Sequence, residues 1–481
     1  MMMKLKTYLL LLTLIAVSAS VQAQQLTDSV LTLQQCLDIG IKNNLVIRQT
    51  QAQMEANRVY WQQARENLLP SLNGDVSHSL SEGRSLNPFT NGYLNQPITS
   101  ASYNLSGSLI LSRGLTLQNS IRQTALAYQA GQTDFQQAKN TLILNLIIAY
   151  LQVLSNDDQL EQAKTQQELS EKQMERTDVL NKEGAVQPQQ LYDIKGLLAA
   201  DRISVINAQN ALTQSKLSVL EIINVPYTNT MRFQRLATDA ITNTYSATAQ
   251  QVYDNALNTF ALVKSGELKR LSAEKGLQVA KGSLLPILSL TGGLNTNYSS
   301  AAQRSIFVNE TVAPTGNFIV TPTGNQPVYT MQSNYVGQNI AYVDQFRNNY
   351  STNVRVGLSI PILNGFQNKN KISLAKIALQ TARNNELANR VQLKVNVDQA
   401  YANMTTAYER YQLLQTQNDA FTESFRIAEA RFNAGASTSV DFLTVKGRLD
   451  QARINFINAR YDYLIRTRVL DYYQGKLELI R

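Results

Sequence analysis

The chain has 481 residues, of which 16% are charged, and its formal net charge is +9. Soluble domains average roughly 25% charged residues, so this composition is poor in charge, and Gln and Asn are frequent instead. The basic residues form no run that could follow a phosphate backbone, which argues against a nucleic-acid-binding protein. A single His, His78, and a single Cys, Cys36, leave little material for a metal cluster or for Cys/His catalysis.

Residues 1–23 have the pattern of a secretory signal peptide. Two lysines precede an apolar run, Tyr8–Val17, and small residues follow it up to Ala23. We expect cleavage after Ala23. An uncleaved anchor helix is the alternative, but the apolar run is short for a bilayer span. Cys36 lies well downstream of the cleavage site, so we expect no lipid anchor.

The rest of the chain is an internal duplication. A shift of 216 residues carries LLPSL (68–72) onto LLPIL (284–288), and a shift of 251 carries Gly114 onto Gly365 and Asn207-Ala208 onto Asn458-Ala459. The shift grows by 35 at one place only, so the second copy contains an insertion of that length. We assign a first repeat to 24–225, a connector to 226–249, a second repeat to 250–475 and a tail to 476–481.

Two very long helices are predicted at 115–183 and 366–434, because none of the ten prolines falls inside them. At 1.5 Å per residue each would be about 100 Å long. Shorter helices are predicted at 33–69 and 189–225. Together they are nearly as long as one long helix, so we expect them to lie beside its two halves and to meet end to end midway. The apolar run 142–154 is interpreted as a buried helix face, since it is too short to span a membrane.

Two strand pairs are predicted, at 71–80 with 101–111 and at 288–294 with 354–362. Apolar and small polar residues alternate along them, as in barrel strands with lipid on one face and water on the other. A half-buried hairpin of a soluble protein has the same pattern, but the signal peptide favours the barrel, with His78 as an ordinary barrel residue. Four strands cannot close a barrel, whereas three chains would supply twelve.

The insertion is expected to form a loop between the strands of the second pair, at about 300–350. It is rich in aromatic residues and could cap the mouth of a barrel or only shield a surface. The aromatic residues are Phe307, Phe318, Tyr329, Tyr335, Tyr342 and Phe346.

Four segments, in this order, carry a resemblance to a known family. They are LTLQQCLDIGIKNNLVIRQ (31–49), ARENLLPSL (64–72), SIPILNGF (359–366) and ARFNAGASTSVDFLTVKGRLDQARINFINARYDYL (430–464). With them the chain resembles the TolC family of outer-membrane efflux proteins over essentially its whole mature length.

The resemblance implies a mixed α and β membrane protein, in which a long α-helical barrel continues into a twelve-stranded β-barrel completed by trimerisation. It places the homotrimer in the outer membrane of a Gram-negative bacterium, extending into the periplasm. It also implies a passive exit duct that docks a periplasmic adaptor (membrane fusion) protein and an inner-membrane pump. No cofactor, metal or nucleic acid is expected. The helix-to-barrel junctions would lie at Pro70, Gly114, Pro286 and Gly365.

The resemblance also places an adaptor-binding surface and a gate at the periplasmic tips. The tip turns, 176–192 and 427–442, contain Gly184-Ala185 and Gly435-Ala436, and the glycines would permit the chain reversal.

The gate residues differ from those of well-known members, which carry a Tyr, an Arg and two acids around the second glycine. This chain has Phe432, Ser437, Asp441 and Thr444 there, and only Asp441 matches. The counterpart of Asp441 in the first repeat is Gln190. Our hypothesis is a gate packed around Phe432 with a ring of three Asp441 carboxylates. The alternative is that Asp441 is merely favoured at a helix start by the helix dipole.

Other functions remain open on the residues alone. Ser272 and Lys275 match the S-x-x-K pattern of some hydrolases, but the companion K-T-G is missing and a solvated helix face explains them better. A secreted coiled-coil scaffold explains the helices but not the duplicated strand pairs. A conduit for type I protein secretion is an alternative to small-molecule efflux.

Overall fold

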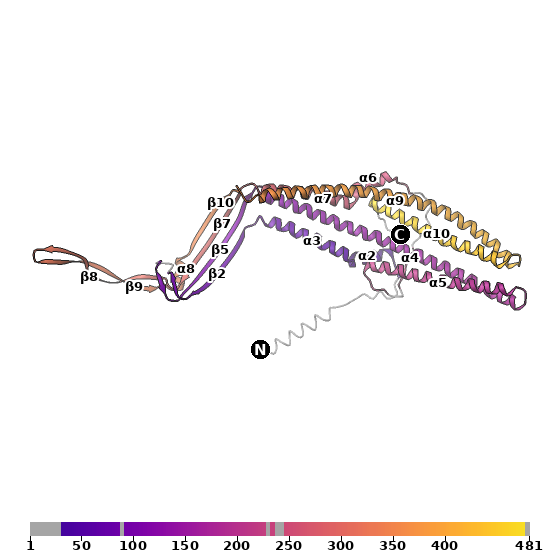
Figure 1. The fold of residues 1–481 in the computed structure, drawn as a ribbon, viewed down its shortest axis with the longest axis horizontal. Coiled ribbons are helices and arrows are strands. Elements are labelled where there is room, and N and C mark those ends of the chain that lie inside the picture. The colour runs from indigo at the N-terminus through magenta and orange to yellow at the C-terminus, as the bar shows by residue number, and fades with distance from the viewer. Residues whose placement is uncertain (1–29, 87–90, 228–230, 236–244, 477–481) are drawn as a thin grey trace, which may run out of the picture. The chain divides into compact units, whose positions relative to one another are not determined.

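The computed structural model describes residues 30–86, 91–227, 231–235 and 245–476. Its helices and strands are labelled in Figure 1. The described residues divide by their contacts into two compact units, the first within 30–56, 129–269 and 383–476 and the second within 57–128 and 270–382. The predicted signal peptide, parts of the connector and the tail beyond 476 lie outside the described residues.

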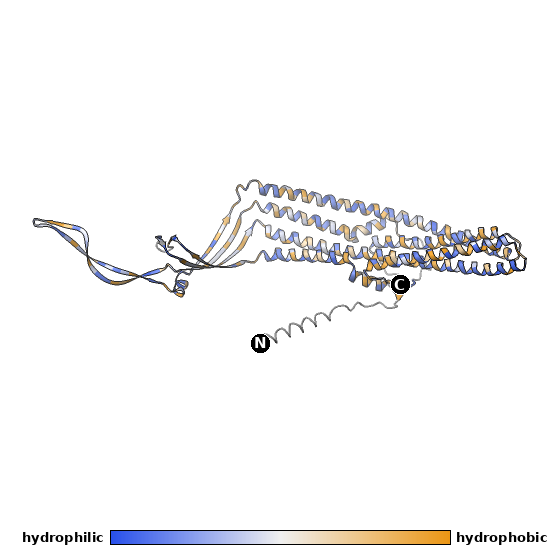
Figure 2. Ribbon diagram, turned by 60° about the horizontal axis from the view of Figure 1, so that its bottom comes forward, coloured by the Kyte–Doolittle hydropathy of each residue, from blue (hydrophilic) through white to orange (hydrophobic). Residues whose placement is uncertain are grey.

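The two longest helices are α4 (Thr116–Lys182) and α9 (Gln367–Asn433), each of 67 residues. Both predictions are confirmed to within one residue at each end. Hydrophobic and hydrophilic residues are interspersed along the helices, and no described helix is hydrophobic throughout (Figure 2). By length and composition α4 alone among the described helices could cross a membrane, but 44% of its apolar stretch is buried within the protein. The buried residues include Leu146, Ile147, Leu151 and Leu154, as expected of a core helix face.

The predicted short helix at 33–69 is wrong in one respect, because it is two helices, α2 (Leu33–Asn43) and α3 (Leu45–Glu66). Asn44 has a ψ of 128°, outside the helical region, and its side-chain oxygen accepts hydrogen bonds from the N–H groups of Val46 (2.9 Å) and Ile47 (3.2 Å). It therefore caps the start of α3. The second repeat has the same break at Phe260, between α6 (Ala249–Thr259) and α7 (Ala261–Gly282).

The short helices of each repeat meet end to end, as predicted. In the first repeat α5 (Pro188–Ile223) ends beside α2, where Asn44 Nδ2 donates to the carbonyl of Ile222 at 2.9 Å. In the second repeat α10 (Ser439–Gln474) ends beside α6, where Tyr472 and Phe260 pack edge to face at 5.3 Å. Each meeting point has a buried apolar core, and α5 and α10 end there at Asn224 and Gly475, both in the left-handed conformation.

The connector contributes a short strand to the first core. Strand β6 (Arg232–Phe233) pairs in parallel with β1 (Val30–Leu31). The hydroxyl of Tyr150, from α4, lies 3.0 Å from the carbonyl oxygen of Leu31 and 2.7 Å from that of Gln234. The connector therefore contains a short strand that is fixed to the first core at this point.

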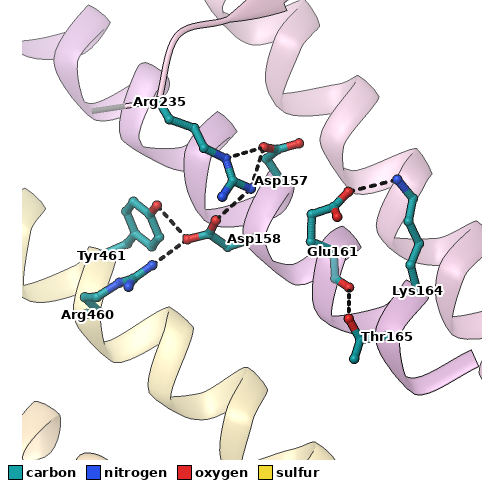
Figure 3. A network of polar contacts seen from close by, with 8 residues as sticks. All are labelled: Asp157, Asp158, Glu161, Lys164, Thr165, Arg235, Arg460 and Tyr461. Atoms are coloured by element: carbon teal, nitrogen blue, oxygen red, sulfur yellow. Dashed lines mark hydrogen bonds and ion pairs between the residues drawn. The ribbon is translucent and has the colours of Figure 1, made fainter. Parts of the chain in front are cut away.

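A polar network holds the connector to both repeats (Figure 3). Arg235 lies 3.0 Å from the Asp157 carboxylate and 3.1 Å from that of Asp158, both on α4. The Tyr461 hydroxyl, from α10, donates to Asp158 at 2.8 Å, and Arg460 pairs with the same carboxylate. Burial raises the pKa of Tyr461 from its usual value near 10 to about 12, which disfavours ionisation of this hydroxyl further.

The second unit contains a four-stranded antiparallel sheet in the order β10-β7-β5-β2. The strands are β2 (Ser71–Ser81), β5 (Ile98–Arg113), β7 (Ile287–Ser299) and β10 (Ser351–Ser359). The predicted pairs are confirmed, except that β10 ends before Ile360 and Ile362 because Pro361 has no N–H for the ladder. A short hairpin, β3 (Arg84–Leu86) with β4 (Tyr93–Asn95), lies between β2 and β5.

The register gives this sheet one apolar and one polar face. Val76 pairs with Tyr103, Leu105 with Leu294, and Leu290 with Val356. The alternate positions are mostly small and polar. Six of their serines pair by hydroxyl contacts of 2.7–2.8 Å: Ser71 with Ser108, Ser77 with Ser102 and Ser79 with Ser100. A sheet with lipid on one face and water on the other requires this separation of apolar from polar residues.

The insertion is not the loop expected from its sequence. It forms a hairpin of β8 (Gln303–Thr321) and β9 (Gly324–Asn339), followed by the short helix α8 (Tyr342–Asn348). Two irregularities in the pairing, after Phe307 and after Pro314, interrupt the alternation along β8 and conceal the strand in the sequence.

Candidate functional site

The tip turns reverse the chain between α4 and α5 and between α9 and α10. Gly184 and Gly435 both have φ of +71°, in the left-handed region that favours glycine. The N–H of Ala185 donates to Leu180 O at 2.8 Å, and that of Ala436 donates to Arg431 O at 2.9 Å. These bonds satisfy carbonyl groups at the helix ends. A Cβ at either glycine would meet open space, so backbone conformation alone accounts for the residue.

A cavity of about 670 Å³ lies between the two tip turns. Of the residues at the predicted gate, Gln190, Phe432 and Ser437 line it, as do Ala185 and Gly435 of the tip turns. Asp441, Gly184 and Ala436 do not line it. Arg176 crosses the cavity region from α4 and donates to the carbonyl oxygen of Asn433 at 2.6 Å, linking the first tip to the second.

Phe432 belongs to an aromatic stack that the sequence reasoning missed in part. The centroid of its ring lies 4.7 Å from that of Phe442, with 17° between the ring planes. The ring of Phe425 also packs on Phe442, with the centroids 5.8 Å apart. Phe442 is 1% exposed and forms a small core with Ile194. The position of Phe442 next to Asp441 in the sequence gives no sign of this role. Whether the packing around Phe432 acts as a gate stays a prediction.

Asp441 takes part in a local contact at the start of α10. Its N–H donates to Thr438 Oγ1 at 3.2 Å, and its carboxylate accepts the Thr438 backbone N–H at 3.3 Å. This reciprocal arrangement is a capping box. The contact is the alternative role that the sequence left open, and it leaves the ring of three carboxylates as a prediction. The Ser437 hydroxyl nearby is buried, with no hydrogen-bond partner among the described residues.

A buried charge cluster lies further along the same helices. Lys446 on α10 is 1% exposed, and its Nζ lies 3.0 Å from Asp201 of α5 and 2.8 Å from Asp450. The Ser170 hydroxyl of α4 donates to the same Asp201 oxygen at 2.5 Å. Burial raises the pKa of Asp450. The spacing of Lys446 and Asp450 is visible in the sequence, but the partner Asp201 is 245 residues away from Lys446.

The predicted junction residues lie where helices and strands join. Pro70 and Pro286 immediately precede β2 and β7. Gly114 and Gly365 have φ of +53° and +61° before α4 and α9. Their surroundings differ, because a Cβ at Gly114 would lie 2.5 Å from Leu285 Cβ, whereas one at Gly365 would meet nothing within 4 Å.

The solvated helix face expected for the enzyme-like pattern is wrong at Ser272, which is buried in a helix contact. Ser272 Oγ donates to the backbone carbonyl of Gln123 at 2.9 Å, which joins α7 to α4. No group of three or more His, Cys, Asp or Glu side chains that could hold a metal ion is found in the described part of the chain. His78 lies on the apolar face of the sheet, opposite Ala101.

The family model described as outer membrane efflux protein matches residues 37–225 and 252–475. The chain belongs to this family. This outer membrane efflux protein is 25% identical over 440 residues to outer membrane protein TolC of Escherichia coli, covering 88% of the chain and 78% of that protein. It is 23% identical over 409 residues to outer membrane protein TolC of Vibrio cholerae, covering 84% and 81%.

Solved structures show the same fold. The outer membrane efflux protein matches CusC with a TM-score of 0.73 and 16% identity, covering 92% of the chain and 91% of CusC. It matches the CmeC outer membrane channel of Campylobacter jejuni with the same TM-score and identity, covering 96% and 92%. The protein is therefore an outer-membrane transport protein with the fold of TolC-like channels, long helices joined to a β domain whose sheet is open in one chain.

Proposed function

We propose that three copies of this chain form an outer-membrane channel with a periplasmic tunnel, the exit duct of a tripartite efflux pump. The observation that carries the proposal is the open four-stranded sheet with one apolar and one polar face. Strands β2 and β10 are its edges, each paired on one side only. Unpaired edges cannot face lipid, because their N–H and C=O groups would have no partners there.

The internal repeat supports closure by identical neighbours. Strand β5 of the first repeat pairs with β7 of the second, so β10 is free to pair in the same way with β2 of the next copy. The open space at Gly365 fits this arrangement. Its counterpart Gly114 is in close contact with Leu285, and the shift of 216 residues places Leu69 of the next copy at Gly365. Three copies then supply twelve strands, enough to close a barrel.

The tips are proposed to contain the gate and the adaptor-binding surface. Phe432, Gln190 and Ser437 line the cavity between the tip turns, and Asp441 would form a three-carboxylate ring in the trimer. The contacts of Arg176 with Asn433 and of Lys446 with Asp201 hold the two helical hairpins together in this state. The exposed turns around Gly184-Ala185 and Gly435-Ala436 would bind a periplasmic adaptor, which connects the duct to an inner-membrane pump. This function needs no catalysis and no cofactor.

Each repeat is proposed to supply the same parts of the channel. Residues 24–225 and 250–475 would each supply one helical hairpin and one strand pair to the ring, and the connector 226–249 a belt midway along the helices. The Arg235 network ties that connector to α4 and α10. A secreted scaffold of soluble coiled coils would have no use for a sheet with an exposed apolar face.

The mass of the detergent-solubilised protein, measured by light scattering and corrected for bound detergent, tests the proposal first. We expect a trimer that forms ion-conducting pores in planar bilayers. A monomer would leave the four strands unable to close, and the channel would have to be abandoned.

A further inference from the structure

The hairpin of β8 and β9 has one face that no other segment covers in the described part of the chain. Apart from the polar pair Glu310 with Ser333, the cross-strand pairs on that face are apolar: Phe307 with Tyr335, Val312 with Met331, Pro314 with Tyr329, and Phe318 with Pro327. Val312, Phe318, Tyr329 and Met331 are all more than half exposed. An exposed apolar patch of this kind marks an interaction surface.

The irregular pairing after Phe307 places this residue on the same face as Val312, with the polar pair Glu310 and Ser333 between them. Without it, Phe307 would share a face with Thr311 rather than with Val312, because side chains alternate along a strand. With it, Phe307 and Val312 both lie on the apolar side. The opposite side is polar and internally bonded except at the pair Ile306 with Val336 and at Ile319. Asn334 donates to Asn309 and to Thr311 at 3.0 Å, and Arg304 donates to Gln338 at 2.8 Å.

The base of the hairpin is held rigidly on the sheet. Gln345 of α8 is 2% exposed, and its side-chain amide bonds Ser299 N and O and the carbonyl of Ile340, all at 2.9 Å. The N–H of Ile340 donates to Ala302 O at 3.0 Å across the base. This base lies at the end of β7 opposite to α7, so in the proposed channel the hairpin rises from the outer rim.

The absence of charge in the distal part of the hairpin, residues 311–332, favours a second copy of the same segment as the partner of the apolar face. Residues 311–332 contain no charged side chain, so they offer nothing to phosphate headgroups or to a charged partner. A two-stranded hairpin is also marginally stable alone in water, and both of its outer edges lack backbone partners. Lipid would cover the side chains but leave those edges unsatisfied.

The trimer would bring three such segments together at high effective concentration. A strand of 19 residues is about 60 Å long, whereas a twelve-stranded barrel has a radius of about 13 Å. Each hairpin is therefore long enough to reach the axis above the pore. We propose that the apolar faces of residues 311–332 from the three copies pack together and narrow the outer mouth of the channel. This inference rests on the proposed trimeric channel.

Two adjacent cysteine variants test it in the purified full-length protein. Val312→Cys puts the thiol on the apolar face, and Thr311→Cys puts it on the polar face one residue away. With a short bis-maleimide we expect Val312→Cys to give covalently linked subunits within each trimer, and Thr311→Cys to give few. Equal linking of both variants, or none in verified trimers, would overturn the inference. So would linking that depends on protein concentration, because it would join separate channels.

Conductance gives an independent readout. Replacing residues 311–332 by a two-residue Asn-Gly turn should leave the trimer intact and raise its single-channel conductance in planar bilayers. An unchanged conductance in an intact trimer would show that the hairpins do not narrow the mouth. Light scattering on the same samples separates this result from failure of the channel itself, since a monomeric parent protein would overturn the proposed function instead.

Discussion

Lys446 and Asp201 are 245 residues apart in the sequence, and the ammonium of one lies 3.0 Å from the carboxylate of the other in the interior of the helical unit. Lys446 also pairs with Asp450, and Asp201 accepts the Ser170 hydroxyl. The cluster thus joins α4, α5 and α10 near the tips. How much the cluster contributes to the stability of the tip depends on its burial, because exposed ion pairs contribute little to the free energy of unfolding.

Lys446→Met should destabilise the protein by about 3–5 kcal/mol, because it leaves two carboxylates buried without their cation. Thermal unfolding of the detergent-solubilised protein measures the effect. Lys172→Met is the matched control, since Lys172 makes a similar pair with Glu168 on the surface and should change little. Adding Asp201→Asn to Lys446→Met should restore part of the loss. Equal effects of the two lysine variants would contradict a structural role for the cluster.

Gly365→Ala should weaken trimer formation. The φ of +61° costs a non-glycine residue about 1 kcal/mol in any state, and in the trimer the new Cβ would also press on Leu69 of the next copy. Gly435→Ala is the control, because Gly435 has φ of +71° and open space around it, far from the sheet edges in the sequence. The temperature at which trimers dissociate on denaturing gels should fall for Gly365→Ala and stay near the parent value for Gly435→Ala.

The register between neighbouring copies can be tested by disulfide formation. Gly107 pairs with Gly292 inside the chain, and the repeat shifts carry these positions onto Leu358 and Val76. Leu358→Cys with Val76→Cys should therefore form an intersubunit disulfide. Leu358→Cys with Leu80→Cys should not, since it is displaced along the strand. Cys36 should take no part, because it is fully buried and burial raises its pKa to about 12. Efficient linking of the displaced pair would mean a different register.

Asp441→Asn tests the proposed carboxylate ring at the gate. The substitution keeps a side chain that can cap α10 and removes the charge, so any change in the channel reports on the charge. We expect the conductance of the parent channel to depend on pH and on divalent cations, and this dependence to be lost in the variant. An Asp441→Asn channel that responds to both as the parent does would leave Asp441 with only its capping role.

The sequence was most informative where a single local rule decides the structure. The uninterrupted length of α4 and α9 follows from the absence of proline, which cannot occupy a helix interior, and their bounds follow from the glycines at 114, 184, 365 and 435. The strand pairs follow from alternation. Prediction was wrong at Asn44, where a side-chain cap interrupts an otherwise helical pattern, and in the insertion, where irregular pairing hides a strand.

The candidate site was predictable in its place but not in its contacts. The tip glycines and Phe432 follow from the repeat and the family resemblance, whereas the stacking of Phe432 on Phe442 does not. The capping box formed by Thr438 and Asp441 does not follow from the sequence either, because the two residues match its pattern only once the start of α10 is known. Burial of Lys446 contradicts the usual expectation that a lysine is exposed.

By itself, the sequence determined the duplication, the long helices, the amphipathic strands and the family, because each depends on spacing along the chain. Only the tertiary structure decided that Lys446 meets Asp201, that β5 pairs with β7, and that Gly114 is crowded while Gly365 is open. These contacts join residues far apart in the chain, and their partners are chosen by packing of whole elements. No local pattern of residues encodes that choice.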